Sequence, residues 1–369
     1  MRKVPFFNYP YVYTNDKDSY LKVIDDVCSR GAFIMQKDLQ EFEQRIADYC
    51  GVKYAVGVAN ATDGLQIGMM AGGIGPGDEV IVCSHTMIAT ASAVHFAGAT
   101  PVPVEVGPDR NIDVASIEAA ITDKTKAICP TQLNGRVANM DAIEAIAKKH
   151  NLQVYEDAAQ ALGAEFKGKK AGSFGVAACF SFYPAKILGC FGDGGIVTTN
   201  DEKVYDKMLL LRDHGRSHKT GEVECWGYNT RLDNLQAAIL NYNFDTYEDV
   251  IKRRRQMAGL YQERLGGLSQ VQLPPPPVDG GDYFDVYQNY EISADRRDEL
   301  KAFLAEKGVG TLMQWGGTAV HQFPKLGFKQ SLPKTDEFFK KMIMIPLNMS
   351  MTDDDVHYVC DQITSFYKA

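Results

Sequence analysis

The sequence lacks the features that mark several large classes of protein. It carries 39 basic and 47 acidic side chains among 369 residues, a formal net charge of −8, whereas nucleic-acid-binding domains usually show a basic excess. Its one compact basic run, residues 253–255, we interpret as a solvated helix face. No stretch approaches the roughly 18 uninterrupted apolar residues that span a membrane, and the N-terminal residues lack the apolar core of a signal peptide. We therefore expect a cytoplasmic protein that binds neither nucleic acid nor membrane.

Paired cysteines are also missing. The eight cysteines are scattered, with no Cys-x-x-Cys pair, and several lie in apolar runs such as residues 81–83 and 127–129. Buried free thiols in a reducing compartment explain this pattern better than disulfides or zinc ligands. His214 and His218 lie four residues apart, but two histidines at this spacing give only weak support for a metal site. We expect no bound metal.

The chain does contain a regular alternation of strand-like and helical patterns from about residue 38. Helical stretches such as residues 38–50 and 140–149 accompany short apolar runs. This alternation is typical of a mainly parallel sheet that helices cover on both faces. The predicted strands are residues 54–58, 79–83, 101–106, 126–129, 152–155, 176–181 and 195–199.

The C-terminal third has a different pattern. Residues 231–267 indicate long helices, and the proline-rich residues 273–278 then break the periodicity as a stiff connector. A strand over 287–292 and a helix over 297–307 fit a smaller α+β domain. We predict a large domain over residues 1–245, with the N-terminal segment included, and a small domain over 246–369.

Lys186 and Asp157 together suggest a pyridoxal phosphate site. Sheets of this kind bind ligands at the carboxyl ends of their strands, and unusual polar loops follow several of the predicted strands. A lysine in a dry pocket can form a Schiff base with an aldehyde cofactor. Asp157 follows a predicted strand and could hold a protonated pyridine nitrogen, although a helix cap is its alternative role.

Four further residues have two interpretations each. Thr62 lies at an expected helix N-terminus, which favours phosphate binding, and Ser181 could add a donor; capping is the alternative for both. Gln160 could bind the phenolic oxygen of the cofactor or be an ordinary polar helix residue. Arg231 could bind a carboxylate through its planar guanidinium, or lie exposed at a helix start.

Six blocks resemble, in order, those of the DegT/DnrJ/EryC1 family of PLP-dependent, fold-type I aminotransferases, many of which act on nucleotide-linked keto sugars. The resemblance covers roughly residues 30–350. It implies an α/β large domain with a doubly covered sheet, pyridoxal 5'-phosphate as cofactor, L-glutamate as donor, and a homodimer with composite sites. The blocks are residues 75–81, 141–143, 156–160, 181–186, 192–195 and 228–238.

The resemblance also implies roles for the residues of the reacting centre. Lys186 would form the Schiff base and act as the general acid and base of a 1,3-proton shift. Asp157 would pair with the pyridine nitrogen, and Gln160 would contact the phenolic oxygen. Because dehydratase-like members of the family have histidine in place of this lysine, Lys186 indicates a transaminase.

The phosphate and donor residues follow from the same resemblance. Thr62 and Ser181 would hold the cofactor phosphate, and Asn229 would reach that phosphate from the neighbouring subunit. Arg231 would help to hold the carboxylate of the amino donor.

Several cofactor positions depart from the family pattern. Ala61 stands where glycine is usual, and Leu162 stands where the family has histidine. Met87 occupies the place of the aromatic residue that stacks on the cofactor ring. A thioether can pack on a ring face, and the neighbouring His85 is a second candidate.

The residues predicted to bind the acceptor depart most from the family pattern. Residues 314–317 read Gln-Trp-Gly-Gly in place of a His-Tyr-Pro segment near the sugar, which makes Trp315 and His321 candidate substrate residues. Residues 229–233 resemble C3-aminating members somewhat more than C4-aminating ones. The leading hypothesis is an aminotransferase for a nucleotide-linked keto sugar. The alternatives are an aminotransferase for a small ketone or ketone phosphate, and a non-catalytic PLP-binding regulator.

Overall fold

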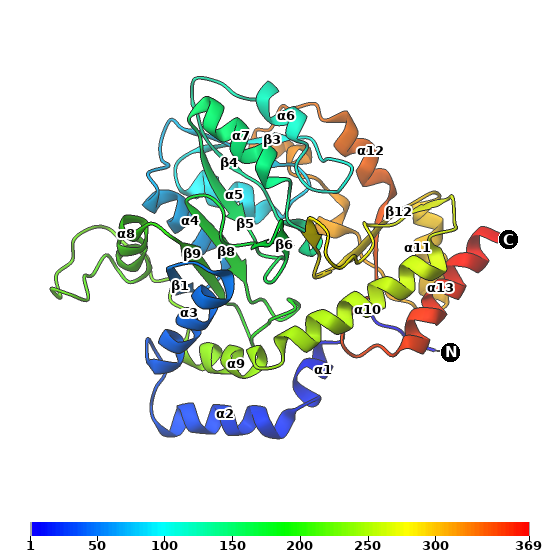
Figure 1. Cartoon of the computed structure of the whole chain (residues 1–369), viewed down its shortest axis with the longest axis horizontal. Coiled ribbons are helices and arrows are strands. Elements are labelled where there is room, and N and C mark those ends of the chain that lie inside the picture. The colour runs from blue at the N-terminus through cyan, green and yellow to red at the C-terminus, as the bar shows by residue number, and fades with distance from the viewer. Residues whose placement is uncertain (1, 369) are drawn as a thin grey trace.

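A seven-stranded sheet forms the centre of the larger part of the molecule in the computed structural model, which describes residues 2–368 (Figure 1). The strand order is β1-β9-β8-β5-β4-β2-β3; β9 is antiparallel to both of its neighbours, and the other neighbouring pairs are parallel. The α/β class and the mainly parallel sheet are therefore confirmed. The strands are β1 (Tyr54–Val58), β2 (Glu79–Cys83), β3 (Thr100–Val104), β4 (Thr125–Cys129), β5 (Gln153–Asp157), β8 (Ala177–Ser181) and β9 (Gly195–Thr199).

Each face of this sheet packs against its own set of helices. Alternate residues of β2 point to opposite faces, so Val80 and Val82 join one apolar core while Ile81 and Cys83 join the other. Because both faces are buried, the strands read as continuous apolar runs. One face carries α4 (Ala61–Ala71), α5 (Ile88–Phe96) and α8 (Glu202–Arg212); the other carries α3 (Lys37–Cys50), α6 (Val114–Ala119), α7 (Met140–His150) and α9 (Asn234–Phe244).

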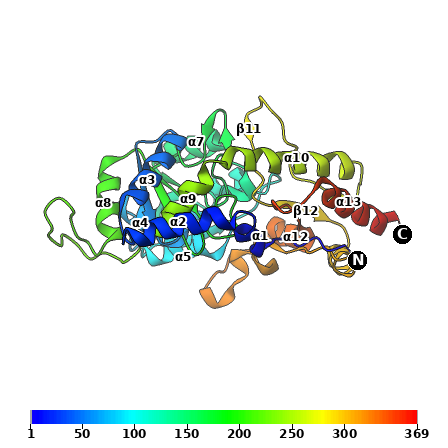
Figure 2. The same cartoon turned by 90° about the horizontal axis from the view of Figure 1, so that it is seen from below.

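A second apolar core lies toward the C-terminal end. There β12 (Tyr290–Ala294) pairs antiparallel with β10 (Val271–Gln272) and β13 (Met342–Ile345). The long helix α10 (Tyr247–Leu265) runs from the sheet side to this core and packs on α13 (Asp353–Lys368) (Figures 1 and 2). This core also contains side chains of α11 (Arg297–Glu306).

The N-terminal segment differs from the predicted division of the chain. Val4 is 1% exposed within the second core and forms a parallel bridge with Val309, so this segment packs with the part that we predict as the small domain. The helix α2 (Lys17–Ser29) returns to the larger part, where it lies alongside α9 (Figures 1 and 2).

The remaining elements are short. No helix among residues 2–368 is long and apolar enough to cross a membrane. The short helices are α1 (Tyr9–Thr14), α12 (Pro333–Lys341), and the 3-10 turns η1 (Leu133–Gly135), η2 (Gln314–Gly317), η3 (Val320–Gln322) and η4 (Pro324–Leu326); the short strands are β6 (Glu165–Phe166), β7 (Lys169–Lys170) and β11 (Tyr283–Phe284).

Candidate active site

A cavity of about 440 Å³ lies where the parallel strands β2, β4, β5 and β8 end and α4 begins. Such strand ends are where ligands bind in open α/β sheets. Most of the predicted cofactor residues line this cavity, together with one predicted substrate residue. These are Ala61, Thr62, Met87, Asp157, Gln160, Ser181, Lys186 and Trp315.

Lys186 lies in the loop after β8, half-buried, with its backbone N–H bonded to the carbonyl of Tyr183 at 2.8 Å. Among the described residues its ammonium group has neither a hydrogen-bond acceptor nor an ion-pair partner within 4.0 Å. Burial lowers the pKa of Lys186 to about 8, although the negative charge of Asp157 opposes the shift. A sizeable fraction of this amine is therefore neutral near physiological pH, and a neutral amine is nucleophilic.

Asp157 is the last residue of β5 rather than a residue beyond the strand, since it pairs with Cys179 of β8. Its carboxylate is 4% exposed. Burial raises the pKa of Asp157, whereas a hydrogen bond from Thr90, one from the amide of Ala159 and the charge of Lys186 lower it. A buried carboxylate of this kind suits a cationic partner such as a protonated pyridine nitrogen.

Gln160 is oriented by the bonds of its amide oxygen. That oxygen accepts from the backbone N–H of Asn134 at 2.8 Å and from the side chain of Asn289 at 3.3 Å. The NH₂ group of Gln160 then remains free to donate a hydrogen bond into the cavity. Because an amide NH₂ only donates, it suits an acceptor such as a phenolate oxygen.

The N-terminus of α4 supplies backbone donors to the same cavity. Asn60 caps the helix by accepting from the N–H of Asp63 at 2.9 Å, while the amides of Ala61 and Thr62 precede the first intrahelical bond. These amides and the helix dipole favour an anion such as phosphate. The glycine-rich segment permits this geometry, since a Cβ atom at Gly195 would lie 2.7 Å from the carbonyl carbon of Asn60.

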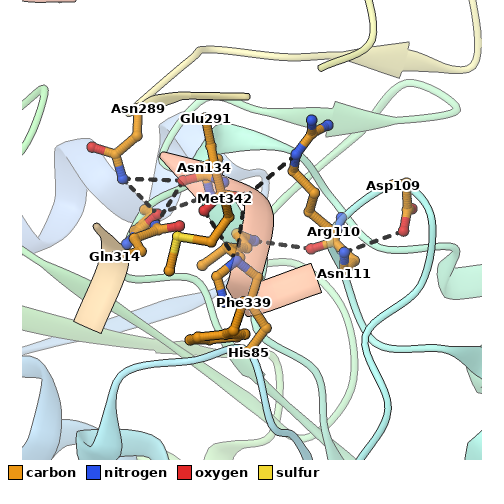
Figure 3. Close-up of polar contacts among 12 residues, drawn as sticks. His85, Asp109, Arg110, Asn111, Asn134, Asn289, Glu291, Gln314, Phe339 and Met342 are labelled. Atoms are coloured by element: carbon orange, nitrogen blue, oxygen red, sulfur yellow. Dashed lines mark hydrogen bonds and ion pairs between the residues drawn. The ribbon is translucent and has the colours of Figure 1, made fainter. Parts of the chain in front are cut away.

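Met87 and His85 take different positions. Met87 is 51% exposed and lines the cavity. The ring of His85 is fully buried and bonds to Glu291 at 3.1 Å (Figure 3). It packs against Phe338 and Phe339, with ring centroids 5.0 Å apart in each pair. The ring of His85 therefore does not face the cavity, and Met87 is the candidate of the two that lines it.

Three predicted residues lie outside the cavity. Asn229 is exposed, and Arg231 forms an ion pair with Asp213 at 3.0 Å. His321 is 8% exposed, and its two ring nitrogens lie 2.7 Å from the Ser84 hydroxyl and 3.0 Å from the Asp336 carboxylate. Both ring nitrogens have partners and His321 lines neither cavity, so a contact with the substrate stays a prediction.

A second cavity, of about 430 Å³, adjoins the first between the sheet and the strands β12 and β13. Trp315 lines both cavities, as does Lys186. The backbone of Trp315 is left-handed, with φ 55°, and its buried indole N–H has no acceptor among the described residues. The adjacent Gln314 is anchored by donating to the side chain of Asn134 at 2.8 Å (Figure 3).

Several lining residues are not selected by sequence reasoning. Thr86 and Thr131 follow β2 and β4 by a few residues, and Tyr183 and Asp193 flank the lysine loop. The position of both threonines just beyond parallel strands is the one signal in the sequence that points to them, and it is weak because threonine is common in loops. Thr90, in the first turn of α5, does not line the cavity and reaches the site through its bonds to Asp157 and Thr86.

Comparisons with known proteins decide the family. Residues 14–364 match the DegT/DnrJ/EryC1/StrS aminotransferase family. The chain belongs to this family.

Its relatives agree with this assignment. The chain is 40% identical to a pleiotropic regulatory protein of Geobacillus stearothermophilus, over 99% of each chain. It is 37% identical to the dTDP-3-amino-3,4,6-trideoxy-alpha-D-glucose transaminase of Streptomyces venezuelae, over 98% of this chain and 95% of the relative. The crystal structure of S. venezuelae DesV in complex with a ketimine intermediate superposes with a TM-score of 0.95 at 36% identity, over 100% of both chains.

This DegT/DnrJ/EryC1 family member is a pyridoxal-phosphate-dependent aminotransferase, and its relatives include nucleotide-sugar aminotransferases. The residues of the first cavity fit the cofactor. An unpaired lysine of lowered pKa, a buried carboxylate, an amide donor and the free amides of a helix N-terminus face one space. These groups suit an aldehyde, a pyridine nitrogen, a phenolic oxygen and a phosphate respectively.

Proposed function

We propose that this aminotransferase moves an amino group from L-glutamate to the ketone of a nucleotide-linked sugar, and that it acts as a homodimer. The observation that carries the proposal is the position of Lys186, which lines both the cofactor cavity and the adjoining cavity of about 430 Å³. A group that must move protons between a cofactor and a sizeable acceptor requires such a shared position. The 3-amino sugar named in the S. venezuelae relative supports this choice of acceptor.

Each residue of the first cavity has a task in this proposal. When bound, pyridoxal phosphate supplies an aldehyde that takes up the donor's amino group and a ring that withdraws electrons from it. Asp157 holds the ring nitrogen protonated, Gln160 donates to the phenolic oxygen, and the start of α4 with Ser181 binds the phosphate. Met87 covers one face of the ring.

Lys186 acts as the proton carrier. Its amine accepts the proton from the donor carbon and returns a proton on the other side of the reacting system, as general base and then general acid. A pKa of about 8 suits both steps, because the group is neither fully protonated nor fully neutral at working pH. Trp315, between the two cavities, would shield this proton transfer from water and contact the acceptor.

The partner subunit would complete the site. The loop after α8 projects from the body of the molecule in both views, and it carries Trp226, which is 98% exposed (Figures 1 and 2). Asn229 and Arg231 follow Trp226 and lie outside their own cavity. We therefore infer that Asn229 reaches the cofactor phosphate of a second copy, with Arg231 near the donor carboxylate.

Half-reactions test the donor and the acceptor separately. L-Glutamate alone should convert the cofactor to its amino form and release 2-oxoglutarate. Keto sugars linked to nucleotides should then restore the aldehyde form faster than small ketones or ketone phosphates do. Faster restoration by a small ketone would support that alternative, which rests on the Gln-Trp-Gly-Gly sequence of η2.

The finer assignment is amination at C3. It rests on the resemblance of residues 229–233 and on the 3-amino sugar in the name of the S. venezuelae relative. Proton NMR of the product from paired 3-keto and 4-keto sugar nucleotides would identify the aminated carbon. A product aminated at C4 alone would overturn the C3 assignment and leave the reaction class intact.

Regulation without catalysis is a second candidate function, because the Geobacillus relative is named a pleiotropic regulatory protein. The intact cofactor set of Lys186, Asp157 and Gln160 favours catalysis. The half-reaction with L-glutamate separates the two, since a purely regulatory protein would bind the cofactor without converting it.

A further inference from the structure

Three buried threonines form a continuous line of hydroxyl groups that ends on the carboxylate of Asp157. Thr131 donates to Thr86 at 2.8 Å, Thr86 and Thr90 are 2.7 Å apart, and Thr90 donates to Asp157 at 2.5 Å. The exposed fractions of the three threonines are 4%, 1% and 0%, so water does not compete for these bonds. Neither the family match nor the names of the relatives assigns a role to them.

The direction of every bond in this line follows from counting protons. A threonine hydroxyl has one proton to donate. Thr90 uses its proton on the carboxylate, so it must accept from Thr86. Thr86 has then used its own proton, and it accepts from Thr131. All three O–H dipoles therefore point toward Asp157, and aligned hydroxyl groups polarise one another.

The backbone holds the line in register with the strand ends. Thr131 and Asp157 form a parallel bridge, in which the Asp157 amide donates to Pro130 at 3.0 Å and the Gln132 amide donates to the Asp157 carbonyl at 2.9 Å. Thr90 lies in the first turn of α5, one helical turn beyond Thr86. The line therefore joins the ends of β4 and β5 to the start of α5.

The arrangement discriminates between the two protonation states of Asp157. The carboxylate accepts from Thr90 on one oxygen and from the amide of Ala159 on the other, at 3.2 Å. A proton placed between Thr90 and the Asp157 oxygen that accepts from it would turn that oxygen into a donor, and accommodating it would reverse or break the line. The other titratable groups that interact with Asp157 are Lys186, which favours the ionised form, and the buried thiols of Cys129 and Cys179, whose pKa values are raised by burial.

We propose that Thr131, Thr86 and Thr90 are positioning residues that keep Asp157 ionised and aimed into the cavity, and that they thereby set both the affinity for pyridoxal phosphate and its pH dependence. In this proposal all three act through Asp157. Thr86 and Thr131 also line the cavity, whereas Thr90 does not, so Thr90 reports the indirect effect by itself. The proposal rests on the cofactor alone, so it stands or falls independently of the nucleotide-sugar acceptor.

The test compares Thr90→Val with Thr90→Ser. Valine keeps the shape and removes the hydroxyl, whereas serine keeps the hydroxyl. We expect Thr90→Val to raise the dissociation constant for pyridoxal phosphate about tenfold or more at pH 7, because a hydrogen bond to a charged group is lost. The acid limb of cofactor binding should move to higher pH, since the pKa of Asp157 loses a lowering influence. Thr90→Ser should stay within about twofold of the parent.

A matched control separates this role from a general packing role. Thr198 of β9 is also fully buried, but its hydroxyl donates to the backbone of Gly172 at 2.7 Å. Thr198→Val should lower the melting temperature of the apoprotein as Thr90→Val does and leave the dissociation constant and acid limb unchanged. Equilibrium dialysis from pH 5.5 to 9, with thermal unfolding of each apoprotein, provides both readouts.

The outcomes are decisive in either direction. Parental affinity and acid limb in Thr90→Val overturn the proposal, and so does an equal loss of affinity in Thr198→Val. If Thr90→Val does not fold, Thr131→Val takes its place, with an expected two- to threefold loss of affinity because the effect passes through two further hydroxyls. An unchanged affinity for pyridoxal phosphate in Thr131→Val would then overturn the proposal that the three threonines act together on Asp157.

Discussion

The two sides of Lys186 differ in how they are built. On the cofactor side, Asp157 and Ser181 terminate neighbouring strands of one sheet, and the start of α4 lies beside them. On the acceptor side, the lining comes from η2 and from strands of the second core, and Trp315 has a left-handed backbone and an unpartnered indole N–H. A rigid sheet edge therefore presents the reaction chemistry, while a turn of unusual conformation faces the acceptor.

This contrast suggests a division of roles. Chemistry that is the same for every acceptor benefits from groups on rigid elements, whereas binding residues are often on loops that the scaffold positions. Variants on the two sides should therefore differ in which half-reaction they slow. Changes at the sheet edge should affect both half-reactions, and changes in η2 should affect only the one with the acceptor.

Replacement of Lys186 should have the largest effect. Lys186→Ala removes the amine that captures the cofactor and moves the proton, and we expect turnover to fall by roughly a thousandfold or more, in line with the loss of a positioned acid and base. Single-turnover absorbance with L-glutamate measures it. Lys167→Ala, which removes an exposed lysine paired with Asp141, is the control and should keep parental turnover. Full activity of Lys186→Ala would contradict the proposed reaction.

The capture of pyridoxal phosphate by the apoprotein should depend on pH through Lys186. Its pKa is lowered to about 8, so the neutral, nucleophilic fraction falls about tenfold for each pH unit below that value. The capture rate should therefore rise from pH 6 to pH 8 and level off above it. Stopped-flow absorbance at several pH values measures this rate. A rate that does not change between pH 6 and 8 would show that the lysine is not the titrating group.

Trp315 tests the acceptor side. Trp315→Ala removes the side chain that lines both cavities, and we expect the KM for the keto acceptor to rise about tenfold, a typical loss for a large buried contact residue. The half-reaction with L-glutamate should change by less than about threefold. Phe96→Ala, at an aromatic side chain of α5 that is 60% exposed and lines neither cavity, is the control for the acceptor KM. Equal losses in both half-reactions of Trp315→Ala would remove the distinction between the two sides.

His321 should show the smallest effect on catalysis. Its ring bonds to Ser84 and Asp336. His321→Ala leaves the buried Ser84 hydroxyl without its ring partner, while Asp336 keeps its bond from Gln322, so the change should cost about 1–3 kcal/mol of unfolding free energy. The kinetic constants at a temperature where the variant is folded should stay within about twofold of the parent. Chemical denaturation and steady-state kinetics measure the two quantities. A large rise in the acceptor KM would show that His321 contributes to substrate binding.

Residue pattern and motif order were sufficient for the sheet and for the cofactor cavity. Buried parallel strands read as apolar runs, and their loops carry the polar groups, so Asp157, Ser181 and Lys186 could be expected at one edge. The same argument was too weak for Thr86 and Thr131, because threonine is common in loops. Thr90 gave no signal, since its role depends on one hydrogen bond across the fold.

The acceptor side could not be predicted in the same way. His321 was expected near the substrate, yet the fold places it between Ser84 and Asp336. His85 stands next to Met87 in sequence, but its ring is directed to Glu291 of β12 instead of the cavity. Ser84 lies 237 residues from His321 in the chain, and Glu291 lies 206 residues from His85.

The sequence by itself determined the mainly parallel sheet and the choice of Lys186 and Asp157 as the proposed cofactor residues, because local periodicity and strand-end position encode them. Only the tertiary structure decided the lowered pKa of Lys186, the direction of the threonine line and the burial of the His85 and His321 rings outside the two cavities. Those properties depend on burial and on contacts between distant segments, and neither is defined until the chain is packed.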